Sequence, residues 1–403
     1  MSLHAYDPRL LEMMYQLTLH QKHMTPKEIA DNITIQGEKV SERTIKRWFK
    51  WLKGKHYFTY YPTMRAYKLG LVSIIAILHD VKNDEVLEIM PYKVYLMRGV
   101  DISKSQNCFV AQYLIPKGYI GAFKKFWQTA KNKGLISNYK LLPLYCAFVL
   151  FSPFHKHTTR EGDLIFKEKI TEPIFTKFAI DELKLNKRIE ISPLIKENPI
   201  IVPLLLEFHR DHTSTRRVWQ NLKERLSSEA WHYIRNKKVR EGKRDGSALV
   251  YIQRAFKTLN CNYAEFFTQN RIAYSPLYSK ENNVNVILTL KLKKHADMIR
   301  LSEELCSRAI YLICCKISKS NTLLLDFVTN SKELVDVLGG ILPKYGERKD
   351  MLYIDYHKSK DYWSTKNWMK SNYYNLFDPE TASWRFEIKK YLGQLNALSS
   401  RKR

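Results

Sequence analysis

The chain has 403 residues, of which 45% are apolar and 13% aromatic, a composition that predicts several packed domains and excludes a disordered tail. Its 67 Lys and Arg residues against 40 Asp and Glu residues give a net charge of +27, which predicts a polyanionic partner. The longest apolar runs, 69–78 and 141–151, are much shorter than the roughly 18 residues of a membrane-spanning helix, so an integral membrane protein is not expected.

Residues 1–65 are predicted to form a winged helix-turn-helix DNA-binding domain. Asp7, followed by a proline, is typical of a helix start. Thr25 and Glu28 form a capping box that opens a second helix, and Ser41 caps a third. The aromatic run 57–61 then has the β propensity of a wing strand.

The third helix is strongly amphipathic. Its apolar residues recur at a spacing of three and four, which predicts that they face the core: Ile45, Trp48, Phe49 and Leu52. Cations lie on the opposite face, as in a helix that enters the major groove of DNA. The predicted DNA contacts on and just after this helix are Arg43, Thr44, Lys46, Arg47, Lys50, Lys53 and Lys55.

Residues 66–151 change from helical to β-rich patterns and are predicted to form a ferredoxin-like domain. Strands and helices alternate there in a β-α-β-β-α-β order: 71–78, 84–92, 94–97, 108–115, 119–133 and 141–151. A charged, partly helical linker is expected at 152–199. The same order returns at 281–358, over the segments 284–292, 296–307, 309–317, 322–328, 332–342 and 351–356.

Residues 200–280 are interpreted as a second, diverged helix-turn-helix. The segment 250–259 repeats the apolar pattern of the first recognition helix but keeps only two of its four outward cations, Arg254 and Lys257. A basic loop before it adds further candidate contacts, which would grip phosphates: Lys237, Lys238, Arg240, Lys243 and Arg244. The last segment, 359–403, is predicted to be a helical extension with a basic tail. The fold class is therefore α+β, with two winged helix-turn-helix units, each followed by a ferredoxin-like domain.

The first half resembles the Lrp/AsnC (leucine-responsive) family of bacterial and archaeal transcription regulators. The resemblance rests on 28–30, on 40–47 and on the segment 68–71 that leads into the first ferredoxin-like strand. It implies a helix-turn-helix joined to a dimerising and ligand-sensing domain. Residues 99–101 are a loose match to the glycine–aspartate turn beside the effector pocket of that family. Unlike the usual family member, this chain carries two modules.

These patterns favour a non-enzymatic, DNA-binding transcription regulator that acts as a pseudo-dimer within one chain. An architectural nucleoid protein with little sequence preference, and an RNA-binding or RNA-polymerase-associated factor, remain alternatives. No catalytic motif, cofactor or metal site is expected, and the six cysteines show no Cys-x-x-Cys spacing. The expected partners are double-stranded DNA and the transcription machinery, in a cytoplasmic, nucleoid-associated monomer or homodimer.

Overall fold

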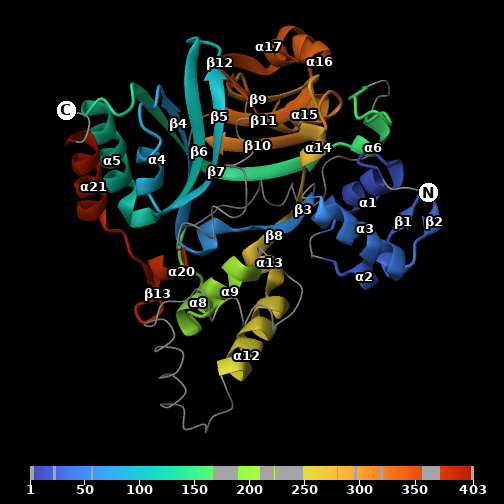
Figure 1. The fold of residues 1–403 in the computed structure, drawn as a ribbon, viewed down its shortest axis with the longest axis horizontal. Coiled ribbons are helices and arrows are strands. Elements are labelled where there is room, and N and C mark those ends of the chain that lie inside the picture. The colour runs from blue at the N-terminus through green and yellow to red at the C-terminus, as the bar shows by residue number, and fades with distance from the viewer. Residues whose placement is uncertain are drawn as a thin grey trace.

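The computed structural model describes residues 4–20, 24–55, 58–166, 189–208, 222, 248–278, 280–294, 297–317, 321–355 and 373–400. Its architecture is mixed α+β, as the sequence predicts, and an antiparallel sheet forms its centre (Figure 1). The sheet closes into a barrel of eight strands in the order β10-β11-β9-β12-β5-β6-β4-β7. Within these described ranges, no helix combines the length and the apolar character that crossing a membrane requires.

Three capped helices precede the barrel, and their bounds are α1 Pro8–Thr18, α2 Pro26–Asn32 and α3 Glu42–Gly54. The side chain of Asp7 accepts a hydrogen bond at the start of α1, Thr25 and Glu28 form the predicted capping box of α2, and Ser41 caps α3. Between α2 and α3 lies a short hairpin, formed by β1 (Thr34–Ile35) and β2 (Glu38–Lys39).

The predicted wing strand does not fold back as a hairpin of its own. It forms β3 (Phe58–Met64), which pairs antiparallel with β8 (Phe267–Tyr274), a strand from the second half of the chain. Tyr60 lies opposite Ile272 in this ladder. The pairing links the two halves next to the helix-turn-helix, which the local sequence pattern does not reveal.

The first half of the barrel contains four strands and its covering helices: β4 Leu71–His79, α4 Val86–Ile89, β5 Lys93–Asp101, β6 Gln106–Pro116, α5 Ile120–Asn132 and β7 Asn138–Phe151. Short 3-10 turns at Ala66–Lys68 and Lys117–Tyr119 precede β4 and α5. The strand order is β5-β6-β4-β7. The helix predicted over 84–92 is only one turn long, and β5 begins one residue before the predicted start and extends four residues beyond the predicted end.

The second half repeats this order, as β10-β11-β9-β12. Its elements are β9 Asn283–Leu292, α15 Asp297–Cys306, β10 Tyr311–Ile317, β11 Thr322–Asn330, α16 Ser331–Asp336, α17 Leu342–Tyr345 and β12 Gly346–Ile354. The single helix expected over 332–342 is divided by a π-helical turn at Val337–Ile341, which contains two glycines and precedes Pro343.

Two seams of unequal length join the halves. Strands β7 and β10 pair over seven residue pairs, from Tyr311 opposite Phe151 to Ile317 opposite Leu144. Strands β5 and β12 pair over three, from Gly99 opposite Ile354 to Asp101 opposite Leu352. Closure removes exposed edge strands from the sheet.

The apolar core is divided by the barrel wall. The interior is filled by a small cluster that includes Ile75, Val110, Ile287 and Leu352. Larger cores lie outside, between the first four strands and α5, and between the second four strands and α15 to α17. The first three helices have a further core, in which α1, α2 and α3 pack with residues of β8 and with one end of β7, β10 and β11.

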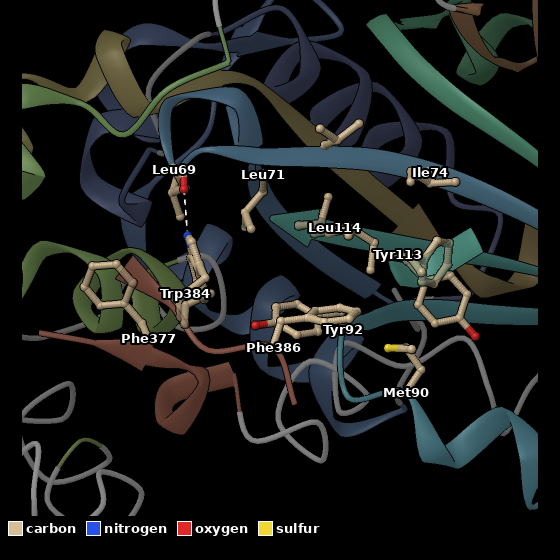
Figure 2. Close-up of a cluster of buried hydrophobic side chains, with 14 of the residues drawn as sticks. Leu69, Leu71, Ile74, Met90, Tyr92, Tyr113, Leu114, Phe377, Trp384 and Phe386 are labelled. Atoms are coloured by element: carbon tan, nitrogen blue, oxygen red, sulfur yellow. Dashed lines mark hydrogen bonds between the residues drawn. The ribbon is translucent and has the colours of Figure 1, made fainter. Parts of the chain in front are cut away.

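The remaining helices and two short strands are α6 Phe154–His157, α8 Pro193–Glu197, α9 Ile201–Phe208, α12 Ala248–Cys261, α13 Tyr263–Phe266, α14 Ser275–Tyr278, α20 Tyr373–Leu376, β13 Phe377–Asp378, β14 Ser383–Trp384 and α21 Ile388–Ser400. In Figure 1, α8, α9, α12, α13, α20 and β13 lie below the barrel, whereas α21 lies beside α5. The C-terminal segment packs on the first half of the barrel, where Trp384 Nε1 donates to the carbonyl of Leu69 at 2.7 Å (Figure 2).

Candidate functional site

The predicted recognition helix has the surface that its sequence pattern indicates. Arg43, Lys46, Arg47 and Lys50 are all exposed on α3, whereas Ile45, Trp48 and Leu52 are buried in the core beneath it. Lys53 and Lys55 are exposed as well. Thr44 is half-buried, its hydroxyl is 3.0 Å from Ser41 Oγ, and it therefore belongs to the helix cap.

The cations of the second half are placed differently. Arg254 and Lys257 are exposed on α12, but this helix packs into the core of the first barrel half, whereas α3 packs into the core of the helix-turn-helix. The candidate contacts at Lys237, Lys238, Arg240, Lys243 and Arg244 lie outside the described residues. Contact of either helix with DNA stays a prediction.

A second group of polar side chains lies inside the barrel, where no site is predicted from the sequence. His79 ends β4 and Asp101 ends β5, and both side chains are only 2% exposed. His79 Nε2 is 2.9 Å from Asp101 Oδ2, and His79 Nδ1 has no hydrogen-bond partner. The ladder brings their strands together: His79 lies opposite Cys108, which in turn lies opposite Gly99, two residues before Asp101 on β5.

The turn that follows β5 is organised by the same carboxylate. Asp101 Oδ1 accepts the amide of Ser103 at 3.0 Å, and Lys104 Nζ is 3.3 Å from Asp101 Oδ2. Asp80 and Ser105, which flank the pair in sequence, have φ values of 45° and 54°. They are two of the four non-glycine residues with positive φ in the described chain, and such strained residues concentrate at functional sites.

An ion pair within the barrel bridges the two halves. Lys140 Nζ, on β7, is 2.5 Å from Asp350 Oδ2, on β12, and Thr289 Oγ1 also donates to that oxygen. Burial alone raises the pKa of Asp350, but the hydrogen bonds from Lys140 and Thr289 and the charge of Lys104 lower it overall. This carboxylate is therefore ionised at neutral pH.

Cys108 is the third polar group beside His79. Burial and the charge of Asp101 raise the pKa of its thiol to about 12, so it is a neutral thiol at neutral pH and a poor nucleophile. No set of three or more His, Cys, Asp or Glu side chains in the described ranges could hold a metal ion. An imidazole whose orientation a carboxylate fixes can take up or release a proton.

Sequence reasoning missed this site because its members, His79, Asp101 and Cys108, come from three different strands. One weak signal existed: Asp101 belongs to the glycine–aspartate match of the Lrp/AsnC resemblance. His79 gave none beyond its position as the polar end of the apolar run 71–78.

No protein-family model and no curated protein matches this sequence. Solved structures of similar fold include the siroheme decarboxylase NirDL, with 11% identity and a TM-score of 0.43, covering 98% of this chain and 100% of that one. The same enzyme with an iron-uroporphyrin III analogue has 10% identity and a TM-score of 0.38, covering 87% and 90%. A candidate monooxygenase from Lactobacillus acidophilus has 8% identity and a TM-score of 0.26, covering 71% and 93%.

These comparisons correct the functional prediction. The structures found are those of enzymes, so the expectation of a DNA-binding transcription regulator without enzymatic activity is wrong. The broader expectation of an Lrp/AsnC-like fold agrees with the order of elements in the first half of the chain. At these TM-scores, the likeness transfers neither a substrate nor the role of any residue to this chain.

Proposed function

We propose that this chain is an enzyme that transfers a proton to or from an anionic substrate, with His79 as the acid–base group. The observation that carries the proposal is the buried hydrogen bond between His79 Nε2 and Asp101, which leaves His79 Nδ1 without a partner. A carboxylate that holds one imidazole nitrogen fixes the tautomer and the orientation of the ring. The other nitrogen is then free to exchange a proton with a bound molecule.

A purely structural role accounts poorly for this arrangement. Burying two ionisable groups costs desolvation free energy, and apolar residues of similar volume usually stabilise a core at least as well. The unpartnered nitrogen adds a cost of about 1–3 kcal/mol. Polar groups kept in so unfavourable a setting are more often found at active sites. The hydrogen bond from Ser103 gives Asp101 an additional role in the turn.

The charges beside the pair indicate the class of substrate. Lys104 and Lys140 have side chains that are 43% and 40% exposed, so both ammonium groups can reach solvent as well as the barrel. A molecule with carboxylates would find Lys104 beside Asp101, the hydrogen-bond partner of the imidazole, and Lys140 on the strand next to β4. Because His79 is buried beside the turn 102–105, binding requires this turn to move.

We further propose that the chain is a tandem duplicate, with two helix-turn-helix units each followed by a ferredoxin-like domain at the boundaries expected from the sequence. Both halves of the barrel have the same strand order. In the second half, the cross-strand pair that corresponds to His79 and Cys108 is Lys291 and Thr322. One acid–base centre per chain follows, in the first half.

The test is an activity assay on the full-length protein with a panel of small and macrocyclic carboxylates that includes siroheme. Substrate loss is followed by mass spectrometry and release of carbon dioxide is measured. His79→Gln and Asp101→Asn are each expected to lower kcat by about 10²–10⁴-fold, with a smaller change in KM. Asp101→Asn keeps an oxygen that can accept the Ser103 amide, so the turn is preserved.

The matched control is His157→Gln. His157 is 3% exposed and lies on α6, outside the barrel, so its replacement reports the general effect of losing a buried histidine. Equal activity in the native chain and the His79→Gln variant would show that His79 is not the acid–base group. Equal losses of activity in the His79→Gln and His157→Gln variants would also show that His79 is not the acid–base group.

A further inference from the structure

Lys140 and Asp350 occupy equivalent places in the two halves of the barrel. Lys140 lies opposite Ile77 on β4, the first strand of its half, and Asp350 lies opposite Thr289 on β9, the first strand of the other half. The strand pairing at the two seams supports the same equivalence between Lys140 and Asp350. Leu144, four residues after Lys140, faces Ile317 on β10, and Ile354, four residues after Asp350, faces Gly99 on β5.

Equivalent residues touch each other only where an approximate two-fold axis passes between them. Lys140 and Asp350 do so, at 2.5 Å, and Thr289 also donates to the bonded oxygen. The axis that relates the two halves therefore runs through an ion pair. The Asp350 side chain is only 14% exposed, so water screens this charge incompletely.

An ion pair on the axis favours pairing of a first half with a second half over pairing of two identical halves. If the first half paired with a second copy of itself, two lysines would meet on the axis. Two copies of the second half would bring two aspartates together. Half-buried like charges in contact oppose association, and such repulsion is a common source of pairing specificity.

We propose that the Lys140–Asp350 pair makes the seam selective, so that the first half accepts only a second half, and that the partner recognised by this surface lies within the same chain. Linkage in one chain adds a high effective concentration and favours the closed monomer. The inference is independent of the catalytic role of His79, because it uses only the register of the strands and the charges at the axis.

The experiment uses three full-length variants. Lys140→Asp places two aspartates at the axis, Asp350→Lys places two lysines there, and the double variant Lys140→Asp/Asp350→Lys restores opposite charges in reversed positions. Differently tagged chains are unfolded in denaturant and refolded alone or together. Light scattering and co-purification then report the assembly.

Mixed refolding of the two single variants is expected to give heterodimers in which each chain lends one half to the other. Every barrel then contains one lysine and one aspartate at its axis. When one tag is used for purification, the amount of the other tag that co-purifies should be about tenfold greater than in a refolded mixture of differently tagged native chains. A tenfold ratio corresponds to a free-energy difference of roughly 1.4 kcal/mol. Each single variant alone should refold with lower yield than the native chain, whereas the double variant should refold as a monomer in native yield.

Lys46→Asp is the matched control, because Lys46 forms an exposed ion pair with Glu42 on α3 at 2.6 Å, away from the seams. This variant changes the net charge equally but should leave refolding and assembly unchanged. Co-purification no greater than in the native mixture would overturn the inference. If the single variants fail to refold, the double variant decides: recovery supports charge selection, and failure overturns it.

Discussion

At the scale of single residues, the shorter seam of the barrel depends on the absence of a side chain at Gly99. A Cβ atom built there would collide with the backbone oxygen of Tyr353 and lie 3.0 Å from Ile354 Cδ1. Both neighbours belong to β12, the strand that closes the barrel against β5. Asp101 follows two residues later on β5, so the same stretch of strand carries both the closure and the candidate site.

Gly99→Ala is therefore expected to destabilise the protein by about 1–3 kcal/mol, the usual cost of inserting an atom into a packed site. Gly121→Ala is the matched control, because Gly121 lies in α5 and its added Cβ would meet nothing within 4 Å. That substitution should raise stability by about 0.4–1 kcal/mol, through helix propensity and the unfolded state. Denaturant unfolding of the two variants measures both effects. Equal stability changes would contradict the role assigned to Gly99.

At the scale of elements, the C-terminal segment acts as a strap that covers the first half of the barrel. Trp384 is 6% exposed and hydrogen-bonds to the carbonyl of Leu69, while Phe386 stacks on Tyr92 with ring centroids 5.5 Å apart (Figure 2). The Tyr92 hydroxyl donates to the carbonyl of Arg385. Burial raises the pKa of this hydroxyl, so it remains a donor throughout the neutral range.

Trp384→Phe should cost about 1–3 kcal/mol, because it leaves the buried Leu69 carbonyl without its donor. Trp384→Ala should cost more, about 3–5 kcal/mol, since the cavity adds to the lost hydrogen bond. The exposed Tyr119→Phe variant, which removes a surface hydroxyl near the same strap, should change stability by less than about 0.5 kcal/mol. Thermal unfolding of the three variants would refute the strap if Trp384→Ala were as mild as Tyr119→Phe.

Elements with strong local signals were predictable, and those set by distant partners were not. The cap at Ser41 and the stripe of Ile45, Trp48 and Leu52 define α3 correctly, because capping and burial act within a few residues. The pairing of β3 with β8 depends on a segment from the other half of the chain. The His79–Asp101 site could not be predicted for the same reason: it needs the register of β4, β6 and β5.

At the scale of the whole molecule, the basic net charge predicts a polyanionic partner, but a net charge alone does not identify that partner. The cations of α3 are exposed as expected. Exposed cations can attract any anion, however, and they do not indicate which reaction the protein catalyses. The sequence pattern did not predict the closed barrel, which places ionisable side chains from both halves in one interior. Its two seams are unequal, and this inequality has a measurable consequence.

The shorter seam should open first. Strands β5 and β12 pair over three residue pairs, extended by the amides of Ile102 and Asp355, which donate to Met351 and Arg98. Strands β7 and β10 pair over seven. Because fewer hydrogen bonds hold the β5–β12 seam, its local opening costs less free energy than opening of the β7–β10 seam. The seam is also continuous with the turn that must move for a molecule to reach His79.

Hydrogen–deuterium exchange measures this directly. The amides of Ile102 and Asp355 should exchange faster than the amides of β10 that bond to β7, by a margin that Gly99→Ala widens. Gly121→Ala should leave both seams unchanged. A ligand of the site that contacts the turn should slow exchange at Ile102 more than in β10, because binding suppresses the opening through which it enters. Equal exchange at the two seams, or faster opening between β7 and β10, would show that the barrel does not open beside His79.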